Sequence, residues 1–117
     1  MIKTGILGSR GEKLALKFLK KQKFKLQEKN YHCRFGEIDL IMWDQSYLVF
    51  IEVRYRKNSD YGGALESIDQ SKQTKLRRSA EFYLTQSNNH NTPCRFDILC
   101  LDGEINKPNY QWIKNAF

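Results

Sequence analysis

The chain has 117 residues, of which 40% are hydrophobic and 28% are charged, and its formal net charge is +7. This length and composition are typical of one globular domain, so we expect residues 1–117 to form a single domain with its own core. No apolar run reaches the roughly 18 residues that a membrane helix needs, and the first residues lack the apolar segment of a signal peptide. The sequence therefore predicts a cytoplasmic protein with no membrane partner.

Positive charge is concentrated toward the N-terminus. Between Arg10 and Arg34, nine Lys or Arg residues stand against Glu12 and Glu28 only, whereas residues 35–66 carry three basic and six acidic residues. A basic flank beside an acidic centre is typical of a protein that holds a polyanion around a metal site. A solvated, lysine-rich helix face explains the same pattern, and charge alone does not choose between the two.

The first predicted element is a helix from Ser9 to about Lys23, because residues 9–12 match a capping box. Leu16 and Leu19 follow Glu12 by four and seven residues, so Glu12 shares their face and is directed toward the core. The role of Glu12 is then helix capping, a function in a site, or both.

Three strands are predicted next. The alternating, mostly polar segment from Phe24 to Tyr31 is typical of a strand near a sheet edge. Residues 37–43 and 47–56 then form a hairpin with a turn at residues 44–46. A turn of that length places Asp39 level with about Ile51 and makes Glu52 its neighbour. The two carboxylates would then lie within reach of one shared ion.

The second half of the chain predicts a loop at residues 58–64, a helix over 67–86, and strands at 94–101 and 110–113. Lys72 lies within the apolar stripe of this helix, which consists of Ile68, Leu76, Ala80 and Leu84. On the strand at 94–101, Arg95 and Asp97 share a face, and we expect them to pair with each other or to support the sheet.

Asp39, followed after twelve residues by Glu52-Val53-Arg54, resembles the signature of the PD-(D/E)XK nucleases. The predicted order of elements, α-β-β-β-α-β-β, is that of their restriction-endonuclease-like core, an α/β fold in which helices flank a central mixed sheet. Residues 36–41 and 50–53 are especially similar to archaeal Holliday junction resolvases. Over nearly the whole chain the sequence resembles the YraN family of bacterial proteins. The segments that carry this likeness are Gly11-Glu12, Gly36 to Ile41, Phe50 to Arg56, Tyr61-Gly62-Gly63, Ser71-Lys72-Gln73, Arg95-Phe96-Asp97 and Ala116-Phe117.

The resemblance implies a Mg²⁺ or Mn²⁺ site. By this likeness Asp39 and Glu52 are the metal ligands, Glu12 is an outer or direct ligand, and the carbonyl of Val53 is an additional oxygen. Such an ion cancels the repulsion between neighbouring carboxylates, polarises a phosphate and activates water. Glu37 shares a face with Asp39 and is a further candidate, unless the strand edge simply exposes it.

Arg54 departs from the lysine that is usual in this superfamily. An arginine can offset charge on a phosphate, but its guanidinium group stays protonated throughout the physiological pH range, which makes it a poor proton shuttle. Lys72, on the inward stripe of the second helix, is a candidate to supply the missing lysine. The alternative is a lysine that extends along the core surface to water.

Several basic residues and one tyrosine are candidates for contacts with nucleic acid, although each is equally explained as solvated surface. They are Arg10, Lys13, Arg34, Arg56, Lys57, Tyr61, Lys75 and Arg78. None forms a base-reading motif, so recognition through the backbone or the shape of the nucleic acid is expected.

These features favour a nucleic-acid-binding protein that cuts phosphodiester bonds with Mg²⁺ or Mn²⁺, with DNA favoured over RNA. One alternative is a module of the same fold that binds nucleic acid without cutting it. Another is a protein-interaction domain that uses its basic helix. A homodimer is compatible with each of these functions.

Overall fold

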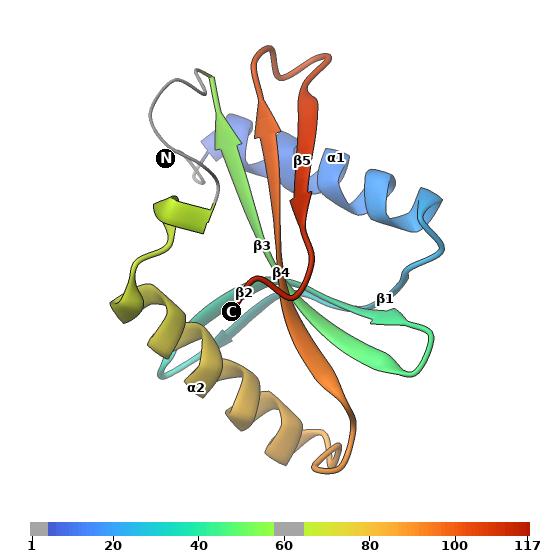
Figure 1. Cartoon of the computed structure of the whole chain (residues 1–117), viewed down its shortest axis with the longest axis vertical. Coiled ribbons are helices and arrows are strands. Elements are labelled where there is room, and N and C mark those ends of the chain that lie inside the picture. The colour runs from blue at the N-terminus through green and yellow to red at the C-terminus, as the bar shows by residue number, and fades with distance from the viewer. Residues whose placement is uncertain (1–4, 58–64) are drawn as a thin grey trace.

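The frame of the protein is a five-stranded mixed sheet with one long helix packed on each face, as seen in a computed structural model that describes residues 5–57 and 65–117 (Figure 1). The strands are hydrogen-bonded in the order β1-β2-β3-β4-β5, and only β3 and β4 run parallel. The elements are α1 (Gly5–Lys21), β1 (Lys25–Cys33), β2 (Gly36–Asp44), β3 (Tyr47–Arg56), the 3-10 turn η1 (Leu65–Ser67), α2 (Gln70–Gln86), β4 (Cys94–Asp102) and β5 (Asn109–Ile113).

Side chains alternate along β3 between two cores because both faces of the sheet are covered. Leu48 and Phe50 pack with α2, whereas Val49, Ile51 and Val53 pack with α1. The predicted α/β class and the order α-β-β-β-α-β-β are confirmed, and the arrangement is compatible with a restriction-endonuclease-like core. None of the described helices is long and apolar enough to cross a membrane.

The start predicted for the first helix was wrong. Helix α1 begins at Gly5, so Glu12 lies in its second turn and does not cap it. The buried stripe of α1 is formed by Gly11, Ala15 and Leu19 at intervals of four residues. Glu12 follows Gly11 directly and is half-buried at the rim of this stripe.

The register predicted for the hairpin was wrong by one residue. Asp44 pairs with Tyr47, so the turn consists of Gln45 and Ser46 only, and Gln45 adopts a φ of 55°. The ladder therefore pairs Leu40, and not Asp39, with Ile51. A turn of two residues is the commonest hairpin connection, but Gln-Ser lacks the Asn-Gly or Gly signal that would have indicated it.

The stripe predicted for the second helix is confirmed in its centre and differs at both ends. Leu76 and Ala80 are buried, but Ile68 precedes α2 and Leu84 is only half-buried. Ser79 and Tyr83 complete the buried face. The edge strand predicted over 24–31 is confirmed as β1, which lies at one edge of the sheet and is mostly exposed.

Candidate functional site

The hairpin of β2 and β3 opens at the point where Asp39 lies. Its ladder ends at Leu40 and Ile51, and beyond this pair β2 continues beside β1 while β3 continues beside β4. The backbone N–H of Val53, which has lost its cross-strand partner, donates to Oδ2 of Asp39 at 2.8 Å. Asp39 is only 3% exposed. Its carboxylate thus satisfies a buried donor that the opening of the hairpin leaves behind.

Glu52 lies opposite Asp39 by extension of this register and faces α2. Its Oε2 atom is 3.5 Å from Nε of Arg54 and 3.5 Å from Nζ of Lys72. The first turn of α2 is held by Asp69, whose side chain accepts from the backbone N–H of Lys72 at 2.8 Å. A helix cap therefore fixes the backbone from which Lys72 reaches Glu52.

The two cations beside Glu52 differ in their access to solvent. The Arg54 side chain is 11% exposed, and it donates to the carbonyl of Ser67 at 3.2 Å, which ties η1 to β3. The Lys72 side chain is 34% exposed. Arg54 is thus part of the wall of the site, whereas Lys72 can contact a ligand that arrives from solvent.

Two cations, Arg54 and Lys72, lie beside Glu52 without a metal ion. Glu12 lines a small hollow of about 80 Å³ with Lys29, Asn30 and Leu40. Leu40 packs with the α1 core, on the face of the sheet opposite Lys72. Within residues 5–57 and 65–117, no group of three or more His, Cys, Asp or Glu side chains is arranged to hold a metal ion.

This donor set fits one kind of metal site only. Mg²⁺ is commonly held by one or two carboxylates, with waters and substrate phosphates as its other ligands. Asp39 and Glu52 match that pattern, and the sequence prediction adds the carbonyl of Val53 as a further oxygen. With so few protein ligands, an ion would bind only weakly without substrate, and an excess of Mn²⁺ would be needed to occupy the site.

The remaining carboxylates of the sequence prediction lie elsewhere. Glu37, two residues from Asp39 on β2, is exposed and lies 3.2 Å from His32 on β1. The predicted pairing of Arg95 with Asp97 is confirmed at 3.0 Å, and Arg95 also reaches Asp44 at 2.9 Å. Burial opposes the charge on Arg95, but its hydrogen bonds to Asp97 and Asp44 raise its pKa.

Asp97 is the centre of a hydrogen-bond network on the face of the sheet opposite the one that carries Lys72. It also accepts from the indole N–H of Trp112 at 3.0 Å and from the backbone N–H of Asn115 at 2.9 Å. Both partners belong to the C-terminal segment of the chain. Asp97 and Arg95 therefore anchor β5 and the residues after it, as support for the sheet.

Apart from Tyr61, the predicted nucleic-acid contacts fall into three groups, which lie on α1, at the end of β3, and where α2 borders the β1–β2 turn. Arg10 and Lys13 lie on α1, where Arg10 donates to Asn106. Arg56 is held in a salt bridge of 2.9 Å to Asp102, which raises its pKa. Lys57 is exposed directly after β3, and Tyr61 lies outside the described residues. Arg34, Lys75 and Arg78 are exposed where α2 borders the β1–β2 turn.

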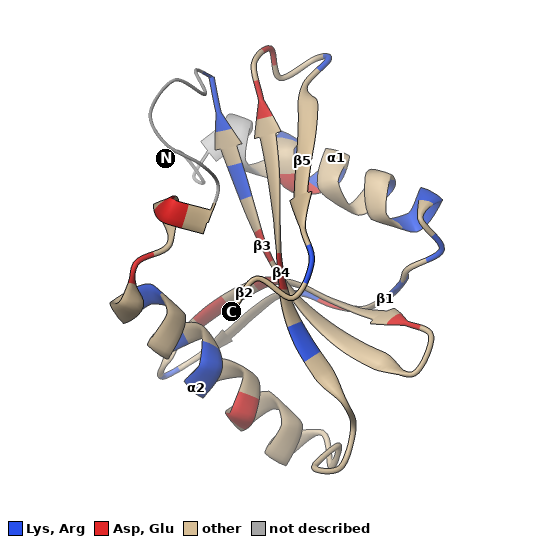
Figure 2. Ribbon diagram, in the orientation of Figure 1, with Lys and Arg blue, Asp and Glu red and all other residues tan. Residues whose placement is uncertain are grey.

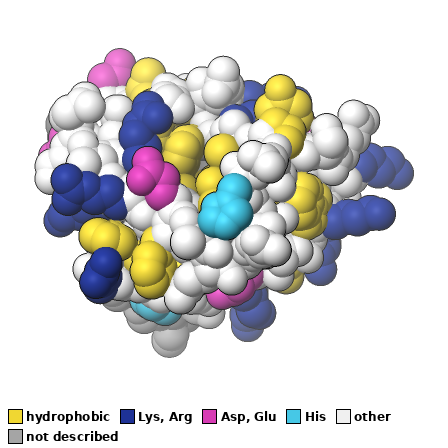
Figure 3. Space-filling view, turned by 90° about the horizontal axis from the view of Figure 1, so that it is seen from below, with side chains coloured by type: hydrophobic (Ala, Val, Ile, Leu, Met, Phe, Trp, Pro, Cys, Tyr) yellow, Lys and Arg dark blue, Asp and Glu magenta, His cyan; other side chains and the backbone are white. Residues whose placement is uncertain are grey.

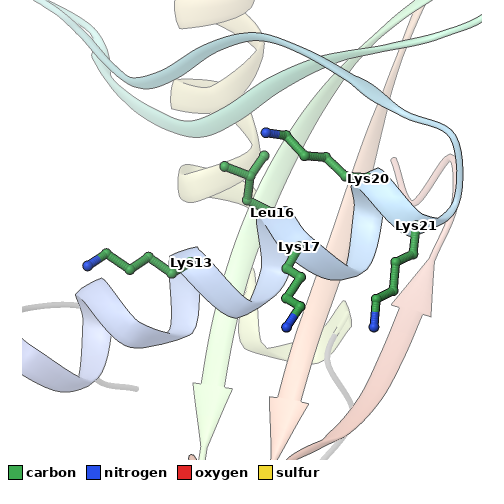
Figure 4. Close-up of a pocket in the computed structure, with 5 residues that line it drawn as sticks. All are labelled: Lys13, Leu16, Lys17, Lys20 and Lys21. Carbon is green, nitrogen blue, oxygen red and sulfur yellow. The ribbon is translucent and has the colours of Figure 1, made fainter.

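Nine of the 20 Lys and Arg residues lie on the two helices, and others lie on strands such as β3 and β4 (Figure 2). On the face seen from below, hydrophobic side chains form small separate patches, and Lys and Arg side chains project at the rim (Figure 3). A shallow groove of about 440 Å³ on α1 is lined by Lys13, Leu16, Lys17, Lys20 and Lys21. Figure 4 shows Lys20 on the same side of the helix as Leu16, with Lys17 and Lys21 on the other side.

Comparison with known proteins identifies the family of this chain. Residues 11–101 match the family described as "Uncharacterised protein family UPF0102". The chain belongs to the UPF0102 family. This match confirms the resemblance to the YraN family drawn from the sequence, and its range includes Glu12, Asp39, Glu52, Arg54 and Lys72.

Relatives of similar length carry the same family name. A UPF0102 protein of Psychromonas ingrahamii is 52% identical over 110 residues, which cover 94% of this chain and 88% of the relative. One from Colwellia psychrerythraea is 48% identical over 108 residues, or 91% of this chain and 84% of the relative. One from Nitrosomonas europaea is 48% identical over 118 residues, or 100% of this chain and 98% of the relative.

Two residues that shape the site were absent from the sequence prediction. Ser67 supplies the carbonyl that Arg54 binds, and Asp69 caps α2 beneath Lys72. A signal for Asp69 was present, because Asp directly before a helical segment is a strong N-cap pattern. No sequence pattern indicates a backbone carbonyl such as that of Ser67.

Proposed function

We propose that this protein binds nucleic acid and hydrolyses phosphodiester bonds with Mg²⁺ or Mn²⁺, using the carboxylates at the open end of the hairpin. The observation that carries the proposal is the approach of Nζ of Lys72 to within 3.5 Å of the buried Glu52 carboxylate. Lys72 belongs to a neighbouring element, is accessible to solvent and lies beside Glu52. In the nuclease-like signature itself, Arg54 stands at the position where a lysine is usual.

Each residue of the site then has a distinct role. Asp39 and Glu52 would hold the metal ion, with the carbonyl of Val53 as an additional oxygen, and such an ion polarises the phosphate and activates water. Lys72 contacts a phosphate oxygen and offsets the charge that develops on it. Arg54 orients Glu52 and holds η1 against β3. Glu12, which lines a hollow with Leu40, the residue after Asp39, remains a candidate outer ligand.

A cleavage assay tests the proposal. Wild-type protein is incubated with duplex, flap, junction and RNA substrates in Mn²⁺, Mg²⁺ or EDTA. We expect cleavage that depends on the metal and is lost in Asp39→Asn, Glu52→Gln and Lys72→Met. Glu37→Gln is the matched control, since it removes an exposed carboxylate from the same strand. Equal activity of Glu52→Gln and wild type would disprove the proposed site.

A second candidate function is favoured by the charge balance of the site. Because Arg54 and Lys72 already compensate Glu52 without metal, the fold can keep these residues as a nucleic-acid-binding surface that does not cut. This alternative predicts binding in EDTA, no stabilisation by Mn²⁺ and no cleavage of any substrate. Thermal melts in Mn²⁺ therefore separate the two functions.

A further inference from the structure

A second feature of the α2 surface is a hollow of about 370 Å³ between this helix and the β1–β2 turn. Its lining includes Arg34 and Phe35 from the turn and Arg78 and Phe82 from the helix. The two phenyl rings are half-buried and lie edge to face, with centroids 5.9 Å apart. The Arg34 guanidinium lies 4.9 Å from the Phe35 centroid and 5.7 Å from the Phe82 centroid.

The two arginines of this hollow differ from those that hold the fold together. Arg56 and Arg95 are bound to carboxylates at 2.9 Å. In the described part of the chain, Arg34 and Arg78 form no salt bridge or hydrogen bond, and both are exposed. Glu81 lines the same hollow but does not pair with either of them. Their guanidinium N–H groups therefore remain available to an anionic ligand.

The hollow is connected to the candidate site by one edge of α2. Lys72 lies at Glu52, Lys75 and Ser79 border Gly36 at the β1–β2 turn, and Arg78 and Phe82 lie in the hollow. At a rise of 1.5 Å per residue, Lys72 and Phe82 are about 15 Å apart along the helix axis. About four stacked nucleotides span that length at 3.4 Å each.

We propose that Arg34, Phe35, Arg78 and Phe82 bind an unpaired nucleotide of the nucleic acid that occupies the Glu52 site. Phenyl rings and an arginine plane can stack on a base only when that base is free of its own duplex neighbours, whereas phosphate contacts need no such exposure. Arg78 contacts the adjoining phosphate. This inference rests on the proposed function and specifies its substrate class, a nucleic acid with a single-stranded segment beside a duplex.

The test measures binding in EDTA, so that cleavage is not required. Fluorescence anisotropy gives Kd for a blunt DNA hairpin whose loop is a linker without bases, for the same hairpin with an unpaired tail, and for one whose tail lacks bases. We expect the tail to strengthen binding and the abasic tail to lose most of this gain. Phe82→Leu keeps an apolar side chain in the packing but removes the ring, and it should weaken binding to the tailed hairpin about five- to 150-fold.

Controls distinguish stacking from a general effect. Phe82→Tyr retains a ring and should bind the tailed hairpin as the wild type does. Arg77→Gln alters the residue next to Arg78, whose guanidinium instead lies over Phe96 and Phe117, and should preserve the preference for the tail. Melting temperatures of all variants identify any loss of folding.

The outcomes separate this inference from the proposed function. Equal affinity for blunt and tailed hairpins, or equal affinity for tails with and without bases, would overturn the unpaired-nucleotide site but leave nucleic-acid binding intact. Failure to bind any of the three hairpins would overturn the proposed function itself. A preference for the tail that persists in Phe82→Leu would overturn the assignment to this hollow.

Discussion

Asp39 is retained in the core because it makes a hydrogen bond that the backbone cannot make there. The opening of the hairpin leaves the N–H of Val53 without a cross-strand carbonyl, and the Asp39 carboxylate accepts it at 2.8 Å. Glu52 is retained differently, by two cations at 3.5 Å. The sequence indicated both residues as candidate metal ligands, but their partners in the protein depend on the point where the ladder ends, which no local pattern indicates.

Asp39 variants should separate hydrogen bonding from charge. In Asp39→Ala the buried N–H of Val53 loses its acceptor, so we expect a loss of about 1–3 kcal/mol in the free energy of unfolding. Asp39→Asn keeps an oxygen acceptor and should lose less than half of that amount. Urea unfolding monitored by circular dichroism measures both. Equal losses in the two variants would show that the charge, and not the hydrogen bond, keeps Asp39.

Glu52→Gln should destabilise the metal-free protein, since it leaves Arg54 and Lys72 without a counter-charge. Breaking a fully buried pair costs about 3–5 kcal/mol, and we expect the lower end because Lys72 is partly solvated. Adding Lys72→Met to Glu52→Gln should recover part of the loss. Thermal melts with EDTA and with Mn²⁺ check this, and Mn²⁺ should stabilise the wild type but not Glu52→Gln. An undiminished melting temperature of Glu52→Gln in EDTA would contradict the ion-pair account.

The three cysteines should differ in reactivity. Burial, together with the Asp102 carboxylate, raises the pKa of the Cys100 thiol to about 11, whereas Cys94 is exposed and Cys33 is half-buried. Only the thiolate reacts, so at pH 8 Cys100 should be about a thousandth ionised and inert to iodoacetamide in the native protein. Mass spectrometry should find label on Cys94 first and on Cys100 only after unfolding. Equal labelling rates for Cys94 and Cys100 in the native protein would refute this.

Among the elements, type and order were more predictable than boundaries and register. Apolar spacing and turn signals predicted the five strands and the second helix, and a capping-box pattern predicted the first helix. The apolar spacing reflects the two cores on either face of the sheet. The hairpin register depended on whether Asp44 belongs to the turn or to the strand. Composition does not decide this, since the φ of 55° at Gln45 is unusual for that residue type.

The same turn offers a test at the level of the element. A positive φ costs a residue with a side chain about 1–2 kcal/mol relative to its preferred conformation, and glycine avoids this cost. We therefore expect Gln45→Gly to raise the free energy of unfolding by up to about 1 kcal/mol, after the greater entropy of glycine in the unfolded chain is deducted. Gln45→Val should lower it. Chemical denaturation measures both changes, and a loss of stability in Gln45→Gly would contradict the observed turn.

For the whole molecule, the proposed function gives the distribution of charge two consequences, one for the attraction of a nucleic acid and one for the position at which it binds. The lysines of α1 lie on the face of the sheet opposite Lys72. Charges within roughly a Debye length contribute to attraction without contacting the ligand, whereas a phosphate that is gripped releases its counterions. The net charge of +7 thus supports general attraction, and the α2 edge supports a specific position.

Neutralising Lys13, Lys17, Lys20 and Lys21 to Gln should therefore weaken binding to all nucleic acids by a similar factor. The slope of log K against log salt should fall by at most about 0.9 for each phosphate contact that is lost on duplex DNA. No base-reading motif is present in the sequence, so duplexes of different sequence but the same shape should bind equally before and after the change. The matched variant, Lys75→Gln with Arg78→Gln, should instead reduce the preference for a tailed hairpin over a blunt one. Anisotropy titrations at several salt concentrations decide this. The division of roles between the two helices would be disproved if the α1 variant lost the tail preference while the α2 variant kept it.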